Sequence, residues 1–150
     1  MNGITVFLHV ISAIVWVGGM IAIRIAVHPI MQSIENPAIK LGKTIEIIGR
    51  LFNLVIPFII LLLVTAVIMA LTLKGSSLYK TVLIKEAIWV VMVINFTFMY
   101  TRRHKASKLF VRGDMASAKA LIALFPNVLL PINIALGLVA LYLGITLRGL

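Results

Sequence analysis

The sequence predicts an all-α integral membrane protein built as a four-helix bundle. Of its 150 residues, 62% are hydrophobic and 12% are charged, and the mean hydropathy is +1.16. These values lie well outside the averages of soluble domains. Apolar segments near or above the roughly 20 residues needed to cross a hydrocarbon layer about 30 Å thick occur four times. Residues 1–150 therefore form a single transmembrane domain.

Each of the four apolar segments is expected to be a transmembrane helix. The expected spans are residues 4–28, 50–73, 79–101 and 122–147. We expect the first to be a helix rather than a cleavable signal peptide, because no Lys or Arg precedes it and its apolar run is too long.

Three connecting segments separate these spans. In the first, "QSIENPAIKLGKTIEIIGR", Asn36-Pro37 marks a helix start; the helix either lies on the membrane surface or extends the second span. The second, "LKGSSLYK", is a short turn. The third, "TRRHKASKLFVRGDMASAKA", is a basic and partly helical loop in which Asp114 precedes a helix-forming stretch.

The net charge of +10 is explained by membrane topology. The basic residues lie beside apolar spans and are not interleaved with aromatic residues along a polar face, so we expect no nucleic-acid partner. Lys and Arg concentrate in the first and third connecting segments, which predicts an inner (cytoplasmic) membrane protein with both termini outside. These basic residues are Lys40, Lys43, Arg50, Arg102, Arg103, Lys105, Lys108, Arg112 and Lys119.

Ionisable residues inside the spans are the main functional candidates, because such groups are costly in a bilayer unless a partner, a cavity or a cofactor stabilises them. The first span contains His9, Arg24 and His28, and the third contains Lys85. His9 and Lys85 are expected at one level near the outer side, and Arg24 with His28 near the inner side. At about 1.5 Å per residue, the two histidines are roughly 28 Å apart and cannot share one metal.

One face of the first helix carries His9, Trp16 and Met20. Gly18 and Gly19 lack side-chain bulk beside Trp16, so a flat ligand or another backbone can approach. A comparable stripe on the third span runs from Lys85 through methionines.

Each of these features also has an ordinary structural interpretation. Trp16 and the methionines pack in many membrane-protein cores. The long side chains of Arg24 and Lys85, and His28 near the inner surface, can reach towards the membrane interfaces. His104 stands among basic loop residues and is expected to be solvated.

Several stretches, in order along the chain, resemble the CopD-like membrane proteins and the related HemJ-type protoporphyrinogen oxidases. They are "HVISAIVWVGG" in the first span, "GRLFNLVIP" opening the second, "VLIKEAIWVVMVINF" in the third and "LFPNVLLPINIALG" opening the fourth. The resemblance covers nearly the whole chain.

The resemblance implies a four-helix bundle that, in the HemJ type, binds haem b and oxidises protoporphyrinogen IX. The family's functional positions match His9, Arg24, His28 and Lys85, with Trp16 and Gly19 in support. The chain departs from the HemJ pattern in the third span, where Asn95 and Phe96 stand in place of a Tyr-His pair, and in the one- or two-residue displacement of Arg24 and His28. In this respect it is closer to the CopD side, which is associated with copper handling.

Haem b is the preferred cofactor, and copper is the alternative. Haem needs an axial ligand, here His9, an apolar slot between helices, and cations for its propionates, such as Lys85 or Arg24. Copper(I) would use thioether or imidazole ligands, but the sequence has no Met-x-x-Met cluster. Without cysteine, thiolate sites are excluded.

The preferred function is therefore that of a haem-binding oxidoreductase or electron-transfer protein, with Arg24 and Lys85 as candidate catalytic residues. It would act on protoporphyrinogen IX or another membrane redox partner. A copper or small-cation transporter and a structural assembly subunit are the other two hypotheses. The small residues Ser12, Gly18 and Gly19 would permit a homodimer.

Overall fold

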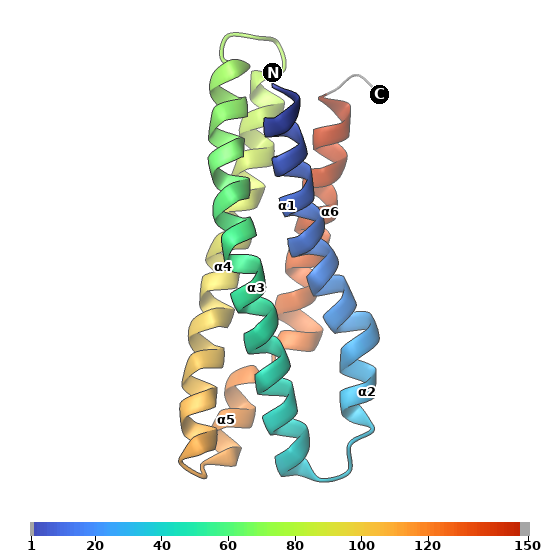
Figure 1. The fold of residues 1–150 in the computed structure, drawn as a ribbon, viewed down its shortest axis with the longest axis vertical. Coiled ribbons are helices and arrows are strands. Elements are labelled where there is room, and N and C mark those ends of the chain that lie inside the picture. Colours follow the sequence, from blue (N-terminus) through green and yellow to red (C-terminus); the bar gives the residue numbers. More distant parts are fainter. Residues whose placement is uncertain (1, 148–150) are drawn as a thin grey trace.

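The computed structural model describes residues 2–147, and Figure 1 shows them as an elongated bundle of helices. The described part of the chain contains no strand. The prediction of an all-α four-helix membrane bundle is confirmed. The helices long and apolar enough to span a membrane are Gly3–Gln32, Pro37–Thr72, Tyr79–Val111 and Met115–Thr146.

Two of the four spans are interrupted by short π-helical segments. The first span consists of α1 (Gly3–Ala22), the π-helical segment η1 (Ile23–Val27) and α2 (His28–Gln32). The second and third are the single helices α3 (Pro37–Thr72) and α4 (Tyr79–Val111). The fourth consists of α5 (Met115–Ile122), the π-helical segment η2 (Phe125–Leu129) and α6 (Leu130–Thr146).

The helices extend further than the expected apolar spans, all at the same end of the bundle. Helix α3 begins at Pro37 rather than near residue 50, and α4 continues to Val111 rather than ending near 101. The segment between the first two spans is therefore an extension of the second span. Hydropathy identifies only the apolar part of a helix, the part that suits the lipid interior. The helix itself continues into the polar sequence beyond it until a capping residue ends it.

Two caps that were visible in the sequence mark helix starts. The side chain of Asn36 accepts hydrogen bonds from the backbone N–H groups of Ala38 and Ile39, at 2.9 and 3.2 Å. Asp114 accepts one from Ser117 N–H at 3.2 Å and starts α5. Such side chains satisfy N–H groups that have no partner within the helix. Gly113, with φ +86°, provides the left-handed residue that separates α4 from α5.

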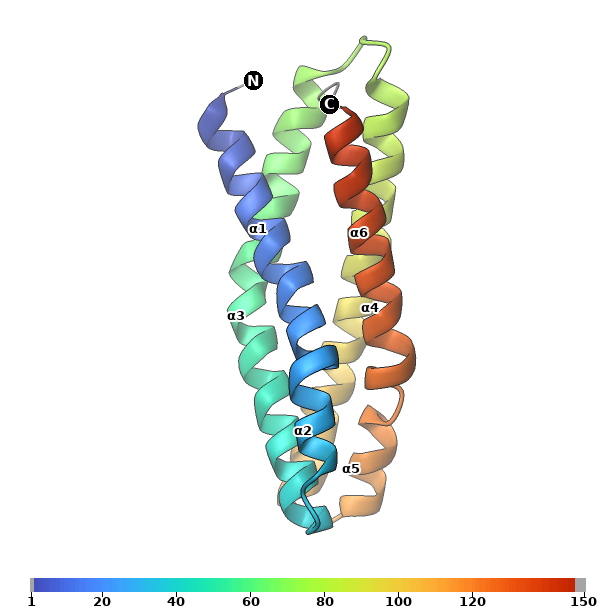
Figure 2. The ribbon, with the colours of Figure 1, turned by 90° about the vertical axis from the view of Figure 1, so that its right-hand side faces the viewer.

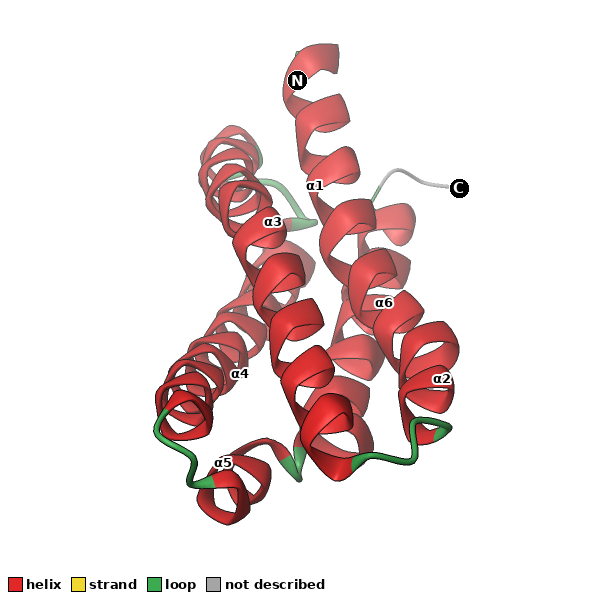
Figure 3. Cartoon of the chain, turned by 60° about the horizontal axis from the view of Figure 1, so that its bottom comes forward, coloured by secondary structure: helices red, strands yellow, loops and turns green. Residues whose placement is uncertain are grey.

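The two ends of the bundle differ in their connections. At one end, called here the terminal end, α1 begins, α6 ends and a short turn joins α3 to α4 (Figures 1 and 2). The opposite end, called the basic end, carries the connection from α2 to α3 and the short helix α5. Figure 3 shows α5 lying beside α4 there, and the two helices are in contact.

Aromatic side chains from all four spans fill the bundle interior. Trp16 and Trp89 stack with ring centroids 5.7 Å apart, and the ring of Phe96 meets Trp16 edge-on at 6.1 Å. The ring centroid of Phe52 lies 4.9 Å from that of Phe96 and 6.4 Å from that of Phe125. Exposed apolar residues such as Ile4, Ile60 and Ile94 cover the outside, as expected for a surface that faces lipid.

Hydrogen bonds of two side-chain amides join α4 to η2 and α6. Asn95 donates to Asn133 Oδ1 at 2.8 Å and to the carbonyl of Leu129 at 3.0 Å. Asn133, which is fully buried, donates to the carbonyl of Met92 at 3.2 Å. Polar side chains of this kind hold helices together in lipid, where an unpaired amide is costly.

Gly137 lies where α6 passes closest to its neighbours, and it generates the first prediction. A Cβ atom there would lie 2.6 Å from Cγ2 of Val17 and 3.3 Å from Cε of Met92. Val17 is β-branched and stiff, so Gly137→Ala should destabilise the protein by about 1–3 kcal/mol, measured by thermal unfolding in detergent.

Gly18→Ala is the matched control, because a Cβ atom at Gly18 meets nothing within 4 Å. Alanine also has the higher helix propensity, so this variant should unfold at the parent temperature or slightly above it. Equal unfolding temperatures for the two variants would contradict the close packing at Gly137.

Candidate functional site

His9 is a buried residue of α1 whose ring is oriented by a threonine on α3. Its Nδ1 atom lies 2.9 Å from Oγ1 of Thr65. The Thr65 hydroxyl is also 2.8 and 2.9 Å from the carbonyl oxygens of Leu61 and Leu62, to which it donates. Because the hydroxyl has one proton, its oxygen accepts from His9 Nδ1–H. In the neutral form of this tautomer, Nε2 is unprotonated and carries a lone pair.

The unprotonated Nε2 of His9 faces the ammonium group of Lys85 on α4. Lys85 Nζ lies 3.4 Å from Nε2 and 3.7 Å from Oε1 of Glu86. Lys85 is only 3% exposed, and its Cδ lies 3.9 Å from the position of a Cβ atom built on Gly144 of α6. The prediction that His9 and Lys85 occupy one level of the bundle is confirmed. The interpretation that Lys85 reaches out to the membrane surface is wrong.

Thr65, His9, Lys85 and Glu86 form what we call the His9–Lys85 cluster. The cluster contains one cation, one carboxylate and one imidazole lone pair, all close together in an apolar bundle. Ionisable groups inside membranes are characteristically paired in this way. The arrangement provides a base or ligand atom, Nε2, next to a positive charge that has its own counter-ion.

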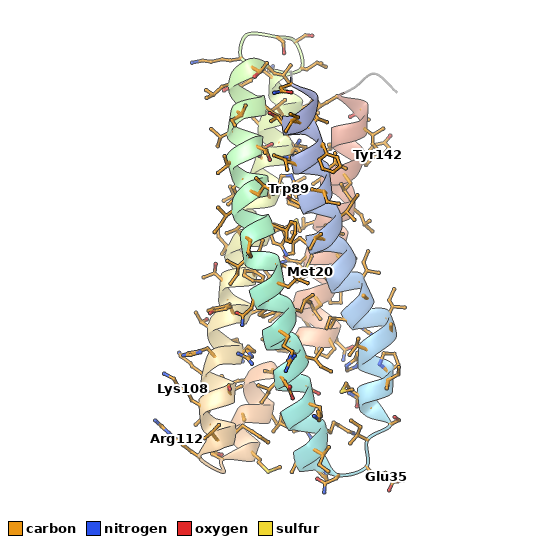
Figure 4. The ribbon with its side chains drawn as sticks, in the orientation of Figure 1. Met20, Glu35, Trp89, Lys108, Arg112 and Tyr142 are labelled. Atoms are coloured by element: carbon orange, nitrogen blue, oxygen red, sulfur yellow. The ribbon has the colours of Figure 1, made fainter. Side chains whose placement is uncertain are left out.

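Two tryptophans fill the interior just below the cluster. Trp89 follows Lys85 by one helical turn, and Trp16 follows His9 by two turns. Figure 4 shows Trp89 directed into the bundle at a level between the terminal end and Met20. Both indoles are fully buried, and among residues 2–147 neither Nε1 atom has a hydrogen-bond partner. Trp16 is thus a packed core residue that also carries an unused donor.

The remaining candidates lie away from the cluster. Gly19 packs closely against α3, where its Cβ position is 2.9 Å from Cδ1 of Leu51. Of the three small residues expected to permit a homodimer, Ser12 is fully buried, Gly19 is half-buried and Gly18 is exposed.

Arg24 and His28 lie towards the basic end. Arg24, in η1, donates from Nη2 to Oδ1 of Asn127 in η2 at 3.4 Å, and His28 lines a cavity of about 530 Å³ that His9 does not reach. Helix rise separates Arg24 from His9 by about 22 Å. The two candidate catalytic residues, Arg24 and Lys85, are therefore not brought together.

The ligand atoms of the cluster suit haem better than a metal held by the protein alone. Among residues 2–147 no three His, Asp or Glu side chains lie close enough together to hold a metal ion. Haem iron needs only one or two protein ligands, because the porphyrin supplies four nitrogens. His9 Nε2 fits that need, and the two unpaired indole N–H groups suit an acceptor such as a carboxylate. The stacked indoles of Trp16 and Trp89, with ring centroids 5.7 Å apart, occupy the interior next to these ligand atoms.

The sequence reasoning missed Thr65 and gave Trp89 no role. Thr65 is an isolated polar residue in the apolar run "LLLVTAVIMA", which was the available signal. Trp89 follows Lys85 at a spacing of four, which places both on one helical face.

Comparisons with known proteins leave the function to be argued from this geometry. No family model, curated protein or solved structure matches the chain.

The hydrogen bond between His9 and Thr65 generates the second prediction. Thr65→Val keeps the shape of the side chain but leaves the Nδ1–H of His9 without an acceptor. An unsatisfied buried donor costs about 1–3 kcal/mol, so the unfolding temperature in detergent should fall. In addition, the ¹⁵N chemical shifts of the His9 ring should change as the Nδ1–H tautomer loses its preference.

Thr97→Val is the control, since Thr97 is exposed and donates only to the carbonyl of Val93 in its own helix. It should leave both the stability and the His9 signals as they are. A Thr65→Val protein with unaltered His9 signals would show that Thr65 does not set the tautomer.

Proposed function

We propose that the protein is a haem b-binding membrane oxidoreductase or electron-transfer protein, with Nε2 of His9 as an axial ligand of the iron. The orientation of His9 carries this proposal. Its Nδ1–H is held by Thr65 and its Nε2 lone pair faces a cation at 3.4 Å. Histidines that bind metals almost always donate their other ring N–H to a neighbouring group, which fixes the ring and raises the basicity of the ligand atom.

Each residue of the cluster has a separate role in the proposed haem site. Thr65 fixes the imidazole ring, and Lys85 provides the positive charge for a propionate carboxylate once Nε2 is taken by iron. The indole N–H groups of Trp16 and Trp89 are donors for the same kind of acceptor. Bound haem would supply one-electron chemistry, which the side chains of this chain cannot perform.

The placement of basic residues supports an orientation for this centre. Nine of the 14 Lys and Arg residues belong to the connections and helix extensions at the basic end. Such residues are retained on the cytoplasmic side. In an inner membrane, the His9–Lys85 cluster would therefore lie towards the periplasmic side. The substrate or redox partner would be protoporphyrinogen IX, as in the HemJ-type proteins the chain resembles, or another reductant that enters from the membrane.

Copper handling is the second candidate, and buried methionines favour it. Met20, Met92 and Met99 are each at most 1% exposed and lie in the bundle interior. Thioether sulfur and imidazole are the ligands that Cu(I) prefers. Haem is favoured over copper because the buried cation of Lys85 beside Nε2 suits a carboxylate-bearing cofactor and repels a free metal ion.

The third prediction tests haem binding directly. Protein expressed with ample haem and purified in detergent should show a Soret band, and His9→Ala should abolish most of it. His104→Ala is the control and should keep the band, because His104 is exposed on α4 at the basic end. A purified protein without a Soret band that instead holds copper lost in Met92→Leu would overturn haem in favour of copper.

The fourth prediction concerns the charge of Lys85. If its ammonium lies beside the haem, Lys85→Met removes a positive charge that disfavours the ferric state. The midpoint potential should therefore fall, by a shift on the order of tens of millivolts, in a spectroelectrochemical titration. Lys80→Met, at an exposed position near the start of α4, should leave the potential unchanged. Equal potentials in both variants would place Lys85 away from the cofactor.

A further inference from the structure

The cavity of about 530 Å³ at the basic end has an apolar interior. It lies among α2, α3, α5, the start of α6 and the two π-helical segments. Six buried hydrophobic residues from five elements form its inner wall. They are Ile23, Leu41, Ile48, Ile122, Phe125 and Leu130.

The polar groups that line this cavity favour an anion. Lys40 on α3 and Lys119 on α5 both contribute a positive charge to the lining. None of the described lining residues is acidic. This imbalance contrasts with the His9–Lys85 cluster, where Glu86 accompanies the cation. A cavity that combines positive charges with apolar walls suits an amphiphilic ligand with an anionic head group.

Both π-helical segments of the described chain meet at this cavity, which is an independent indication of a functional site. Ile23 and Val27 of η1 face it from the first span, and Phe125, Pro126 and Asn127 of η2 face it from the fourth. Single turns of π-helix inside α-helices occur frequently at functional sites, because the extra residue redirects the side chains. The Arg24–Asn127 hydrogen bond joins the two segments.

We propose that this cavity binds an anionic phospholipid from the adjacent leaflet. The acyl chain contacts the apolar inner wall, and the phosphate group is held by Lys40 and Lys119. Both halves of the ligand are thus matched by residues that line the cavity, and the membrane itself supplies the ligand. Basic side chains near a membrane surface attract anionic lipids, each contributing roughly a fivefold gain in binding. This proposal is independent of haem binding at His9.

The test compares lipid binding to the detergent-purified full chain by native mass spectrometry. Phosphatidylglycerol is the probe, and phosphatidylcholine is its zwitterionic counterpart. The parent protein should retain phosphatidylglycerol in preference, and Lys40→Ala/Lys119→Ala should weaken its binding by roughly 25-fold. Lys105→Ala/Lys108→Ala removes the same charge from exposed positions on α4 outside the cavity lining and should leave binding within about twofold of the parent.

A second variant tests the apolar half of the site without altering charge. Ala123 lines the cavity, so Ala123→Trp should fill it and displace the lipid, while the unfolding temperature in detergent stays near that of the parent. Equal retention of both lipids, equal loss in the two lysine pairs, or full retention in Ala123→Trp would each overturn the proposal. Displacement of phosphatidylglycerol by millimolar inorganic phosphate would also overturn it, because the site would then recognise phosphate alone.

Discussion

The contact between the Lys85 ammonium and the His9 imidazole is the constraint on which the terminal half of this bundle depends. A charged group inside a bilayer is costly unless it is paired, and here the partners lie on different helices. His9 on α1 is tied to Thr65 on α3 and to Lys85 on α4. A one-residue rotation or shift of any of these helices would separate the groups. The cluster therefore fixes the register of three helices at once, and the apolar packing below it follows from that register.

The two ends of the bundle differ in whether their basic side chains have acidic partners. At the terminal end, Lys85 is buried and Glu86 lies 3.7 Å away, so the charge of the ammonium is nearly balanced. At the basic end, lysines line an accessible cavity without an acidic partner among its described lining residues. Arg24, towards the basic end, is half-buried and donates a hydrogen bond to Asn127. A buried cation with its own counter-ion suits a permanent structural or cofactor centre. Cations without an acidic partner near the surface suit the binding of an external anion.

Hydropathy and capping residues were sufficient to predict the fold, because membrane thickness and backbone hydrogen bonding leave few alternatives. Asn36 and Asp114 identified helix starts correctly. The site was only partly predictable. Depth along the helices placed His9 beside Lys85, but Thr65 could not be recognised as their partner, because a threonine in an apolar helix commonly bonds only its own backbone. The π-helical segment η1 itself contains no Gly or Pro, but Pro29 follows its last residue by two positions. Proline has no backbone N–H and its ring crowds the carbonyl four residues earlier, so this residue was the local signal for an interrupted helix.

The pairing of Lys85 with Glu86 also bears on the proposal that His9 binds a metal ion. Any cation or proton that takes Nε2 must displace the ammonium of Lys85, and an isolated ammonium in this interior would oppose that exchange strongly. Glu86 Oε1 already lies 3.7 Å from Nζ and has no hydrogen-bond partner of its own among the described residues. The displaced ammonium therefore keeps a counter-ion within reach of a small rotation of its stem. Glu86 thus supports the proposed ligand role of His9, because it offers the ammonium of Lys85 a partner other than Nε2.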